Sequence, residues 1–90
     1  MKFSFSLVPS SPIAKFGDVI AEAESWGYDL AWTPDQGFMH DPFVALSYLM
    51  TRTEKIALGV GITNPYQRHP IQIARAAVTL ADMRPGGFVL

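Results

Sequence analysis

The chain has 90 residues, no Cys and a formal net charge of -1 at pH 7, with 49% hydrophobic and 17% charged residues. The absence of Cys excludes a disulfide framework and a thiolate metal site, and the near-neutral charge gives no attraction to nucleic acid or to an anionic membrane. Because small domains have a high ratio of surface to volume, this hydrophobic content predicts that further polypeptide or another subunit covers part of the surface, and we expect a homo-oligomer.

The first predicted elements are a strand over residues 3–8 and a helix that begins near Pro12. Residues 1–9 lack the basic region and long apolar core of a signal peptide, and no run approaches the roughly 20 apolar residues of a membrane span. We therefore expect a soluble, cytoplasmic protein. Proline suits the first position of a helix, Ser11 before it is a candidate cap, and a three-four spacing of apolar residues continues to a stop at Gly27.

The next two units repeat this pattern. A predicted strand over residues 30–33 precedes a helix that begins at Asp41-Pro42. A predicted strand over residues 56–63 precedes a helix that begins at His69-Pro70.

Alternating strands and helices predict an α/β fold with parallel strands and right-handed crossovers. The prolines that begin the helices are 30 and then 28 residues apart, close to the roughly 31 residues per unit of a (β/α)8 TIM barrel. A doubly wound sheet has a similar spacing, so the period leaves both architectures open. A fourth apolar run, residues 88–90, ends the chain inside a strand. We expect residues 1–90 to form the N-terminal fragment of a longer domain.

Polar residues follow the predicted strands at the end where parallel α/β folds place their sites. Asp35 is a carboxylate directly at such an end, and it is a candidate general acid or base or a ligand-binding residue. Thr63 and Asn64 offer hydrogen bonds at the end of the third strand. For all three residues, ordinary turn formation is the alternative.

The loop before the third helix carries two further candidates. Arg68 is either a partner for a phosphate or carboxylate group or a solvated surface charge, and His69 is a candidate helix cap. His40 and His69 lack the spacing of metal ligands, so we expect no metal site. Trp26 and Trp32 are expected in the core or between a helix and a strand.

Two glycines interrupt the third strand, where a bare backbone usually lowers stability. Gly59-Val60-Gly61 is not the dinucleotide fingerprint, because the third glycine is missing and no helix follows at once. The run GITNPY over residues 61–66, with Arg68 and Pro70 at the same spacing behind it, resembles the luciferase-like flavin and deazaflavin oxidoreductases. The resemblance covers the whole chain and is strongest to the coenzyme F-420-dependent methylenetetrahydromethanopterin reductase branch.

The resemblance implies a (β/α)8 barrel, of which this chain is the N-terminal part, whose mouth holds the ring of coenzyme F-420 or, alternatively, of FMN. It implies that Gly61, Ile62, Thr63 and Asn64 bind the cofactor. It also implies a non-prolyl cis peptide bond between Gly61 and Ile62, for which an ordinary trans bulge is the alternative. Asp35 matches an acidic residue of the family, and we expect it to be catalytic.

Two positions depart from the reductase branch. Ser6 stands where the branch typically has a Glu, and Gln36 stands where an Asp-His pair has its His. We expect both to contact the substrate, and the missing acid group argues against methylenetetrahydromethanopterin itself. The implied activity is hydride transfer between coenzyme F-420 and a small organic molecule. The alternatives are an FMN-dependent monooxygenase and a truncated, non-catalytic module that needs the rest of the barrel.

Overall fold

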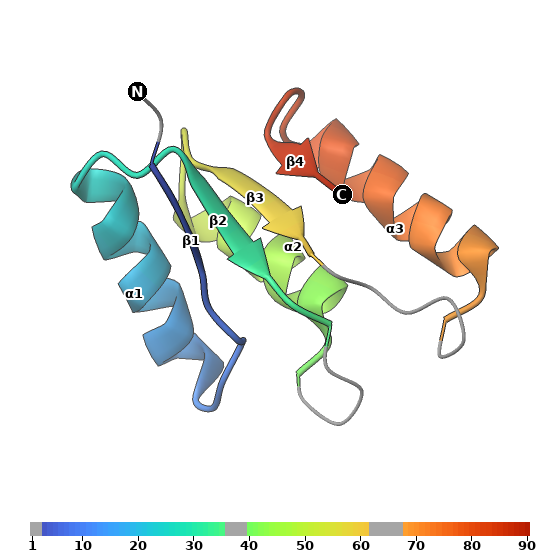
Figure 1. The fold of residues 1–90 in the computed structure, drawn as a ribbon, viewed down its shortest axis with the longest axis horizontal. Coiled ribbons are helices and arrows are strands. Elements are labelled where there is room, and N and C mark those ends of the chain that lie inside the picture. The colour runs from blue at the N-terminus through green and yellow to red at the C-terminus, as the bar shows by residue number, and fades with distance from the viewer. Residues whose placement is uncertain (1–2, 36–39, 62–67) are drawn as a thin grey trace.

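A computed structural model describes residues 3–35, 40–61 and 68–90 of the chain. Strands and helices alternate along these residues, as Figure 1 shows. In chain order the elements are β1 (Ser4–Ser6), α1 (Ile13–Ser25), β2 (Leu30–Thr33), α2 (Pro42–Arg52), β3 (Ala57–Val60), α3 (Pro70–Met83) and β4 (Phe88–Val89).

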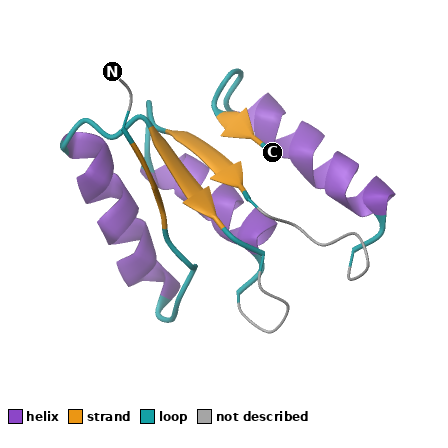
Figure 2. Cartoon of the chain, viewed as in Figure 1, coloured by secondary structure: helices purple, strands orange, loops and turns teal. Residues whose placement is uncertain are grey.

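The strands form one parallel sheet in the order β1-β2-β3-β4, with the helices packed against one of its faces (Figures 1 and 2). Helix α2 lies between α1 and α3 and contacts both. A doubly wound sheet carries helices on both faces, whereas a barrel carries them only outside. The arrangement therefore confirms the barrel-type alternative and the predicted order of the strands.

At two of the three helix starts, the residue before the proline caps the helix. A carboxylate oxygen of Asp41 accepts hydrogen bonds from the backbone N–H groups of Phe43 and Val44, at 2.9 and 3.1 Å. The Nδ1 atom of His69 accepts one from Ile71 at 3.1 Å. These acceptors satisfy N–H groups that have no partner inside the helix.

The first helix differs from the prediction at its start and agrees with it at its end. Helix α1 follows Pro12 without a side-chain cap, so the prediction that Ser11 caps it is wrong. At the other end, Gly27 has a φ of +91°, a conformation that glycine adopts without steric cost. The predicted stop at Gly27 is thereby confirmed.

The core lies between the helices and the sheet. Alternate strand residues point to opposite faces, and Ala31, Leu58 and Val60 are buried among helix residues on one of them. The largest fully buried helix side chains there are Ile20, Leu46 and Leu49. The expectation for Trp26 is wrong, because its side chain is 71% exposed after the end of α1.

Two charged side chains hold the connection between α2 and β3 at the amino end of the sheet. A carboxylate oxygen of Glu24, in α1, accepts hydrogen bonds from the consecutive backbone N–H groups of residues 54–56, at 2.6 to 2.9 Å. The guanidinium of Arg84, after α3, donates to the carbonyl oxygens of Met50, Thr53 and Ile56. All three helices are thus joined at the end of the sheet that lies opposite the predicted site.

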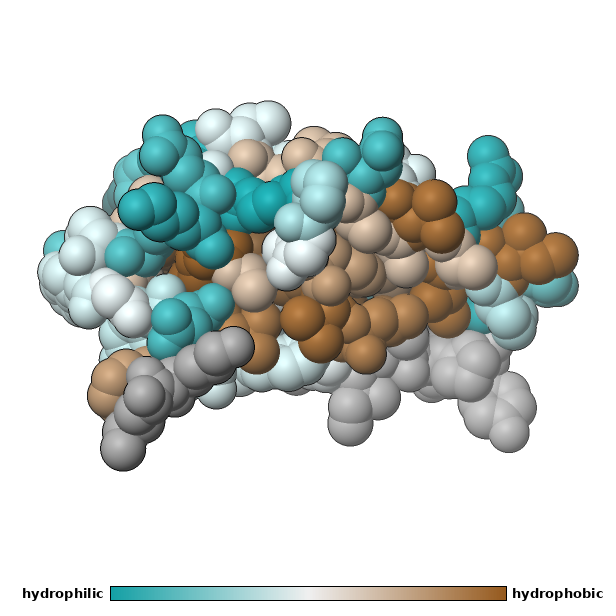
Figure 3. All heavy atoms as spheres, turned by 90° about the horizontal axis from the view of Figure 1, so that it is seen from above, coloured by the Kyte–Doolittle hydropathy of each residue, from teal (hydrophilic) through white to brown (hydrophobic). Residues whose placement is uncertain are grey.

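The surface keeps a large apolar fraction. Figure 3 shows a band of hydrophobic side chains across the molecule, with hydrophilic atoms gathered mainly along one side of it. Exposed large hydrophobic residues occur in all three helices and at both outer strands, and they include Phe3, Val44, Ile71, Val78 and Leu90. Among the described residues, no helix has the length and hydropathy to cross a membrane.

Candidate functional site

The ends of β2 and β3 and the beginnings of α2 and α3 lie at the same end of the sheet (Figure 1). Parallel strands joined by helical crossovers have this geometry. All the strands run in the same direction, so their carboxyl ends, and the loops that lead to the next helices, lie at the same edge of the sheet. Two features of the described residues lie at or near this end. One is an ion-pair cluster of Asp35, Arg68 and Asp41, and the other is an aromatic wall that Trp32 forms over Gly59 and Gly61.

The ion-pair cluster consists of Asp35, Arg68 and Asp41. The Nε atom of Arg68 donates to Oδ2 of Asp35 at 2.6 Å, and one terminal nitrogen, Nη2, donates to Oδ2 of Asp41 at 2.7 Å. The same Nη2 lies 3.4 Å from Oδ1 of Asp35. The guanidinium carbon lies 5.1 Å from the ring centroid of Phe43, within the range of a cation–π contact. One arginine therefore joins the end of β2 to the first turn of α2.

Charge and burial differ within this cluster. The side chain of Asp35 is 6% exposed, that of Arg68 25% and that of Asp41 39%. Burial raises the pKa of Asp41, but the hydrogen bond from Arg68, the backbone N–H groups of Val44 and Phe43 and the charge of Arg68 outweigh it, and the pKa lies below its ordinary value. The hydrogen bond to Asp35 raises the pKa of Arg68. Burial lowers that pKa, but the hydrogen bond to Asp41 and the charges of both carboxylates raise it further, and it lies above its ordinary value.

The aromatic wall lies on the face of the sheet that the helices leave free. Trp32 points there, because its neighbours Ala31 and Thr33 are buried on the helix side. A Cβ atom on Gly59 would lie 2.7 Å from Cε3 of Trp32, and one on Gly61 would lie 3.1 Å from the same atom. The indole therefore covers both glycines. The expectation that Trp32 packs in the core or between a helix and a strand is wrong.

This packing gives a reason for the bare backbone of β3. The sequence-based interpretation left room at Gly61 for a cofactor ring, whereas the indole of Trp32 lies against that backbone. Gly59 has a second constraint, because its Cβ would also lie 3.0 Å from the carbonyl oxygen of Val89 in β4. Both glycines thus allow an aromatic ring to lie close to the strand.

The predicted site residues fall into two described groups. Asp35 lies in the ion-pair cluster, and Ser6 is the strand partner of Trp32, which in turn is paired with Gly59. Gly61 borders the same wall. Gln36, Ile62, Thr63 and Asn64 lie outside the described residues, as does the predicted cis bond between Gly61 and Ile62.

Sequence reasoning did not identify two parts of this region. Arg68 was considered for an external anion or for solvent, and its pairing with Asp35 and Asp41 was not foreseen. Trp32 was assigned to the wrong face. Two features of the sequence indicate the position of Trp32. Side chains alternate between the two faces along a strand, and the next strand has two glycines that leave room for a large ring.

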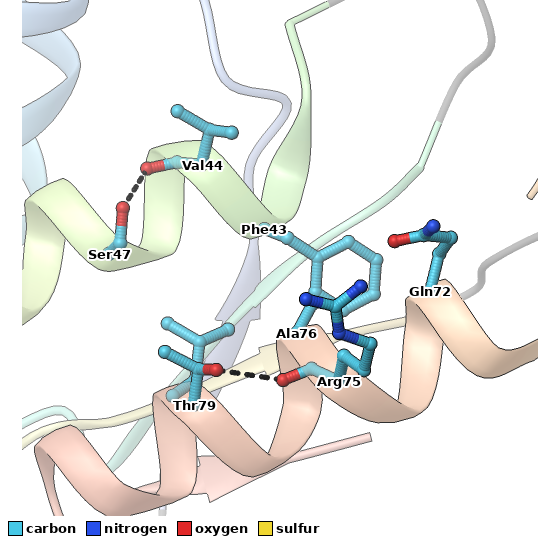
Figure 4. Close-up of a pocket in the computed structure, with 8 residues that line it drawn as sticks. Phe43, Val44, Ser47, Gln72, Arg75, Ala76 and Thr79 are labelled. Atoms are coloured by element: carbon cyan, nitrogen blue, oxygen red, sulfur yellow. Dashed lines mark hydrogen bonds between the residues drawn. The ribbon is translucent and has the colours of Figure 1, made fainter.

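A second concave region lies between α2 and α3, on the helix side of the molecule. It has a volume of about 340 Å³, and Figure 4 shows the ring of Phe43, from α2, beside Arg75 and Gln72 of α3. All its lining residues belong to these two helices. Within the described part of the chain, no group of three or more His, Cys, Asp or Glu side chains has a geometry that would hold a metal ion.

Comparison with known proteins identifies one family. The family model described as luciferase-like monooxygenase matches residues 1–90. The chain is 33% identical over its whole length to a 5,10-methylenetetrahydromethanopterin reductase of Methanolobus tindarius, and 37% identical over 97% of its length to that of Methanopyrus kandleri. It spans 28% and 25% of these two relatives, about a quarter of their length.

The solved structures agree with the sequence relatives. The structure of the coenzyme F420-dependent tetrahydromethanopterin reductase from Methanopyrus kandleri superposes with a TM-score of 0.91 at 34% sequence identity. The match covers 98% of this chain and 25% of that one. The chain therefore has the fold of the N-terminal part of a luciferase-like TIM barrel.

Proposed function

The chain belongs to the luciferase-like monooxygenase family, and from this we propose that it contributes the N-terminal part of an oxidoreductase that transfers hydride between coenzyme F-420 and a small organic substrate. One observation carries the proposal: methylenetetrahydromethanopterin reductases match 97% or more of the chain at 33% and 37% identity. The solved relative with a TM-score of 0.91 is named as F420-dependent.

The described residues fit one side of a planar cofactor ring. The face formed by Trp32, Gly59 and Gly61 presents the indole against the bare strand, and Ser6, the strand partner of Trp32, adds a hydroxyl group beside it. We propose that Gly61, Ile62, Thr63 and Asn64 hold the ring at the carboxyl end of β3. When bound, coenzyme F-420 supplies the hydride chemistry, and the protein supplies orientation and exclusion of water.

We propose Asp35 as the catalytic residue for proton transfer, with Ser6 and Gln36 in contact with the substrate. The support for Asp35 is its place after β2, beside the end of the sheet where barrel sites form. Ser6 supplies a hydroxyl group and no acid group, so we propose a substrate other than methylenetetrahydromethanopterin. The cytoplasmic location and the homo-oligomeric state also remain proposals.

An FMN-dependent monooxygenase is the second candidate function. The description of the matching family model, luciferase-like monooxygenase, favours it. The two candidates differ in the cofactor that they bind. Binding of either cofactor can be measured directly, because both absorb visible light and fluoresce. We therefore propose to titrate the purified full-length protein with coenzyme F-420 and, separately, with FMN.

The Asp35→Asn variant tests the catalytic assignment. We expect turnover to fall by about 100- to 10,000-fold, the usual effect of losing a general acid or base, with little change in the dissociation constant of the cofactor. Steady-state kinetics and fluorescence titration measure the two quantities separately. A variant that binds cofactor much more weakly but turns over normally would place Asp35 on the cofactor and contradict the assignment.

A further inference from the structure

Arg68 is paired with side chains of its own chain, whereas an arginine that binds an anionic ligand keeps its donors for that ligand. Its Nε and Nη2 atoms already donate to two carboxylates of this chain, at 2.6 and 2.7 Å, and its guanidinium carbon lies 5.1 Å from the ring centroid of Phe43. Arginine has a planar fork of donors, so two partners in different directions fix its orientation. The contacts make Arg68 a connector between segments of the chain.

The two carboxylates differ in what fixes them. Asp41 uses Oδ1 to cap α2 through Phe43 and Val44, and it uses Oδ2 to bind Arg68. The first turn of α2 therefore holds Asp41, and Asp41 holds the guanidinium. Asp35 lies outside every helix and strand, and Arg68 contacts both of its oxygens at 2.6 and 3.4 Å.

Burial makes this contact matter for Asp35. Its side chain is 6% exposed, and a buried carboxylate is costly unless charged or hydrogen-bonding partners surround it. A side-on arginine fixes the plane of the carboxylate as well as its charge. Arg68 thus contributes to the direction of the Asp35 oxygens, and it links them to the start of α2.

We propose that Arg68 is a positioning residue, which aims the carboxylate of Asp35 by anchoring it to the capped start of α2. The proposal rests on the proposed function, in which Asp35 transfers a proton. It assigns Arg68 a role in the rate of the reaction and none in holding an anionic group of the substrate or cofactor.

The kinetic test compares Arg68→Ala and Arg68→Lys with Arg75→Ala as the matched control, since Arg75 is an exposed arginine of α3. We expect kcat of Arg68→Ala to fall by about 10- to 100-fold, because a misplaced catalytic group costs about this much. KM and the dissociation constant of the cofactor should change less than about threefold. Lysine is a point charge without a fork, so Arg68→Lys should recover only part of the activity.

Two further measurements separate positioning from a structural role. Low concentrations of guanidinium chloride should partly restore kcat of Arg68→Ala, whereas the same concentrations of sodium chloride should not. In the double variant with Asp35→Asn, the loss of Arg68 should cost almost nothing further, because residues that act as a unit have non-additive effects. Additive effects, or a fall in Tm with normal kcat, would show that Arg68 only stabilises the structure, and would overturn the proposal.

A rise in KM without a fall in kcat would assign Arg68 to an anionic ligand, and this result would also overturn the proposal.

The contact between Arg68 and Asp35 can be tested without an activity assay. The measurement is the NMR signal of the Arg68 Nε–H group in the full-length protein. Its protection from exchange should be lost in Asp35→Ala, which removes the acceptor, and kept in Asp41→Ala, because Nε donates to Asp35 and Nη2 to Asp41. If neither cofactor supports activity, the proposed function fails. Independently of that result, a signal unchanged in Asp35→Ala would refute the anchoring of Asp35.

Discussion

Gly59 in β3 and Gly61 directly after it are both constrained by the side chain of Trp32. Gly59 is limited by Trp32 and by the backbone of β4, whereas Gly61 is limited among the described residues by Trp32 alone. A backbone oxygen cannot move as a side chain can, so the two positions should respond differently to the same added methyl group.

We expect Gly59→Ala to lower the free energy of unfolding by about 1–3 kcal/mol, the usual cost of overpacking, and Gly61→Ala to cost less. Urea denaturation of the full-length protein measures both changes. The Trp32→Leu background is the control, because removing the indole should relieve most of the strain at Gly61 but leave the Val89 contact at Gly59. Equal costs in both backgrounds would show that Trp32 does not restrict these positions.

The beginning of α2 makes part of the stability dependent on pH, through Asp41. The folded state lowers the pKa of Asp41 from its ordinary value of 3.8. A depressed carboxylate pKa means that the unfolded chain binds more protons, so this contribution to stability is present above about pH 3.8. It should disappear as the pH falls through the lower, folded-state pKa.

The Asp41→Asn variant isolates this effect, because Asn is also a good helix cap but carries no charge. We expect the variant to lose less stability than the wild type between about pH 4 and pH 2. Thermal unfolding at a series of pH values measures the difference, with Asp82→Asn, an exposed carboxylate of α3, as the control. Parallel curves for wild type and Asp41→Asn would show that Asp41 has no part in acid unfolding.

The three helices are also connected at the opposite end of the sheet, through Glu24 and Arg84. Burial raises the pKa of Glu24, but hydrogen bonds from Ile56, Lys55 and Glu54 and the charge of Arg84 lower it below its ordinary value overall. Both side chains hold the connection between α2 and β3, so we expect their effects to be coupled.

Glu24→Gln and Arg84→Met should each lower the free energy of unfolding by about 1–3 kcal/mol, the range for hydrogen bonds to charged groups. The double variant should cost less than the sum, since each residue stabilises the same backbone segment. Urea denaturation measures the cycle, and Glu22→Gln, on the exposed side of α1, is the control. Strict additivity would show that the two contacts act independently.

At the scale of the whole molecule, the chain presents only one wall of the proposed site. The described strands leave one face of the sheet without helices, and β1 and β4 are both at its edges. Unpaired edges favour association with another chain. A polypeptide of residues 1–90 alone should therefore fold marginally or self-associate.

We expect this polypeptide to bind coenzyme F-420 and FMN more weakly than about 1 μM, or roughly -8 kcal/mol. Fluorescence titration measures the affinity, and the full-length protein is the positive control. Tighter binding by residues 1–90 would mean that one wall is a sufficient site. Recovery of binding on addition of the rest of the barrel would support the view that cofactor contacts come from further βα units.

The sequence by itself determined the order and type of the elements. The proline that begins each helix, the caps at Asp41 and His69 and the stop at Gly27 depend on contacts within a few residues, which local sequence specifies. The period of the repeat left the barrel and the doubly wound sheet open, and the family resemblance of the run at residues 61–66 led to the prediction of a luciferase-like barrel. The cap expected at Ser11 was wrong even so, because a suitable residue type does not ensure the hydrogen bond.

Only the tertiary structure decided which residues meet. Arg68 lies 33 residues from Asp35 and 27 from Asp41, and no local pattern encodes their contact. The face of the sheet that receives Trp32 depends on strand register and on the glycines of the neighbouring strand, since a shift by one residue reverses every side chain. The position of the helices on one face of the sheet distinguishes the barrel from a doubly wound sheet. It also depends on the pairing of strands that are distant in sequence, so local patterns did not decide it.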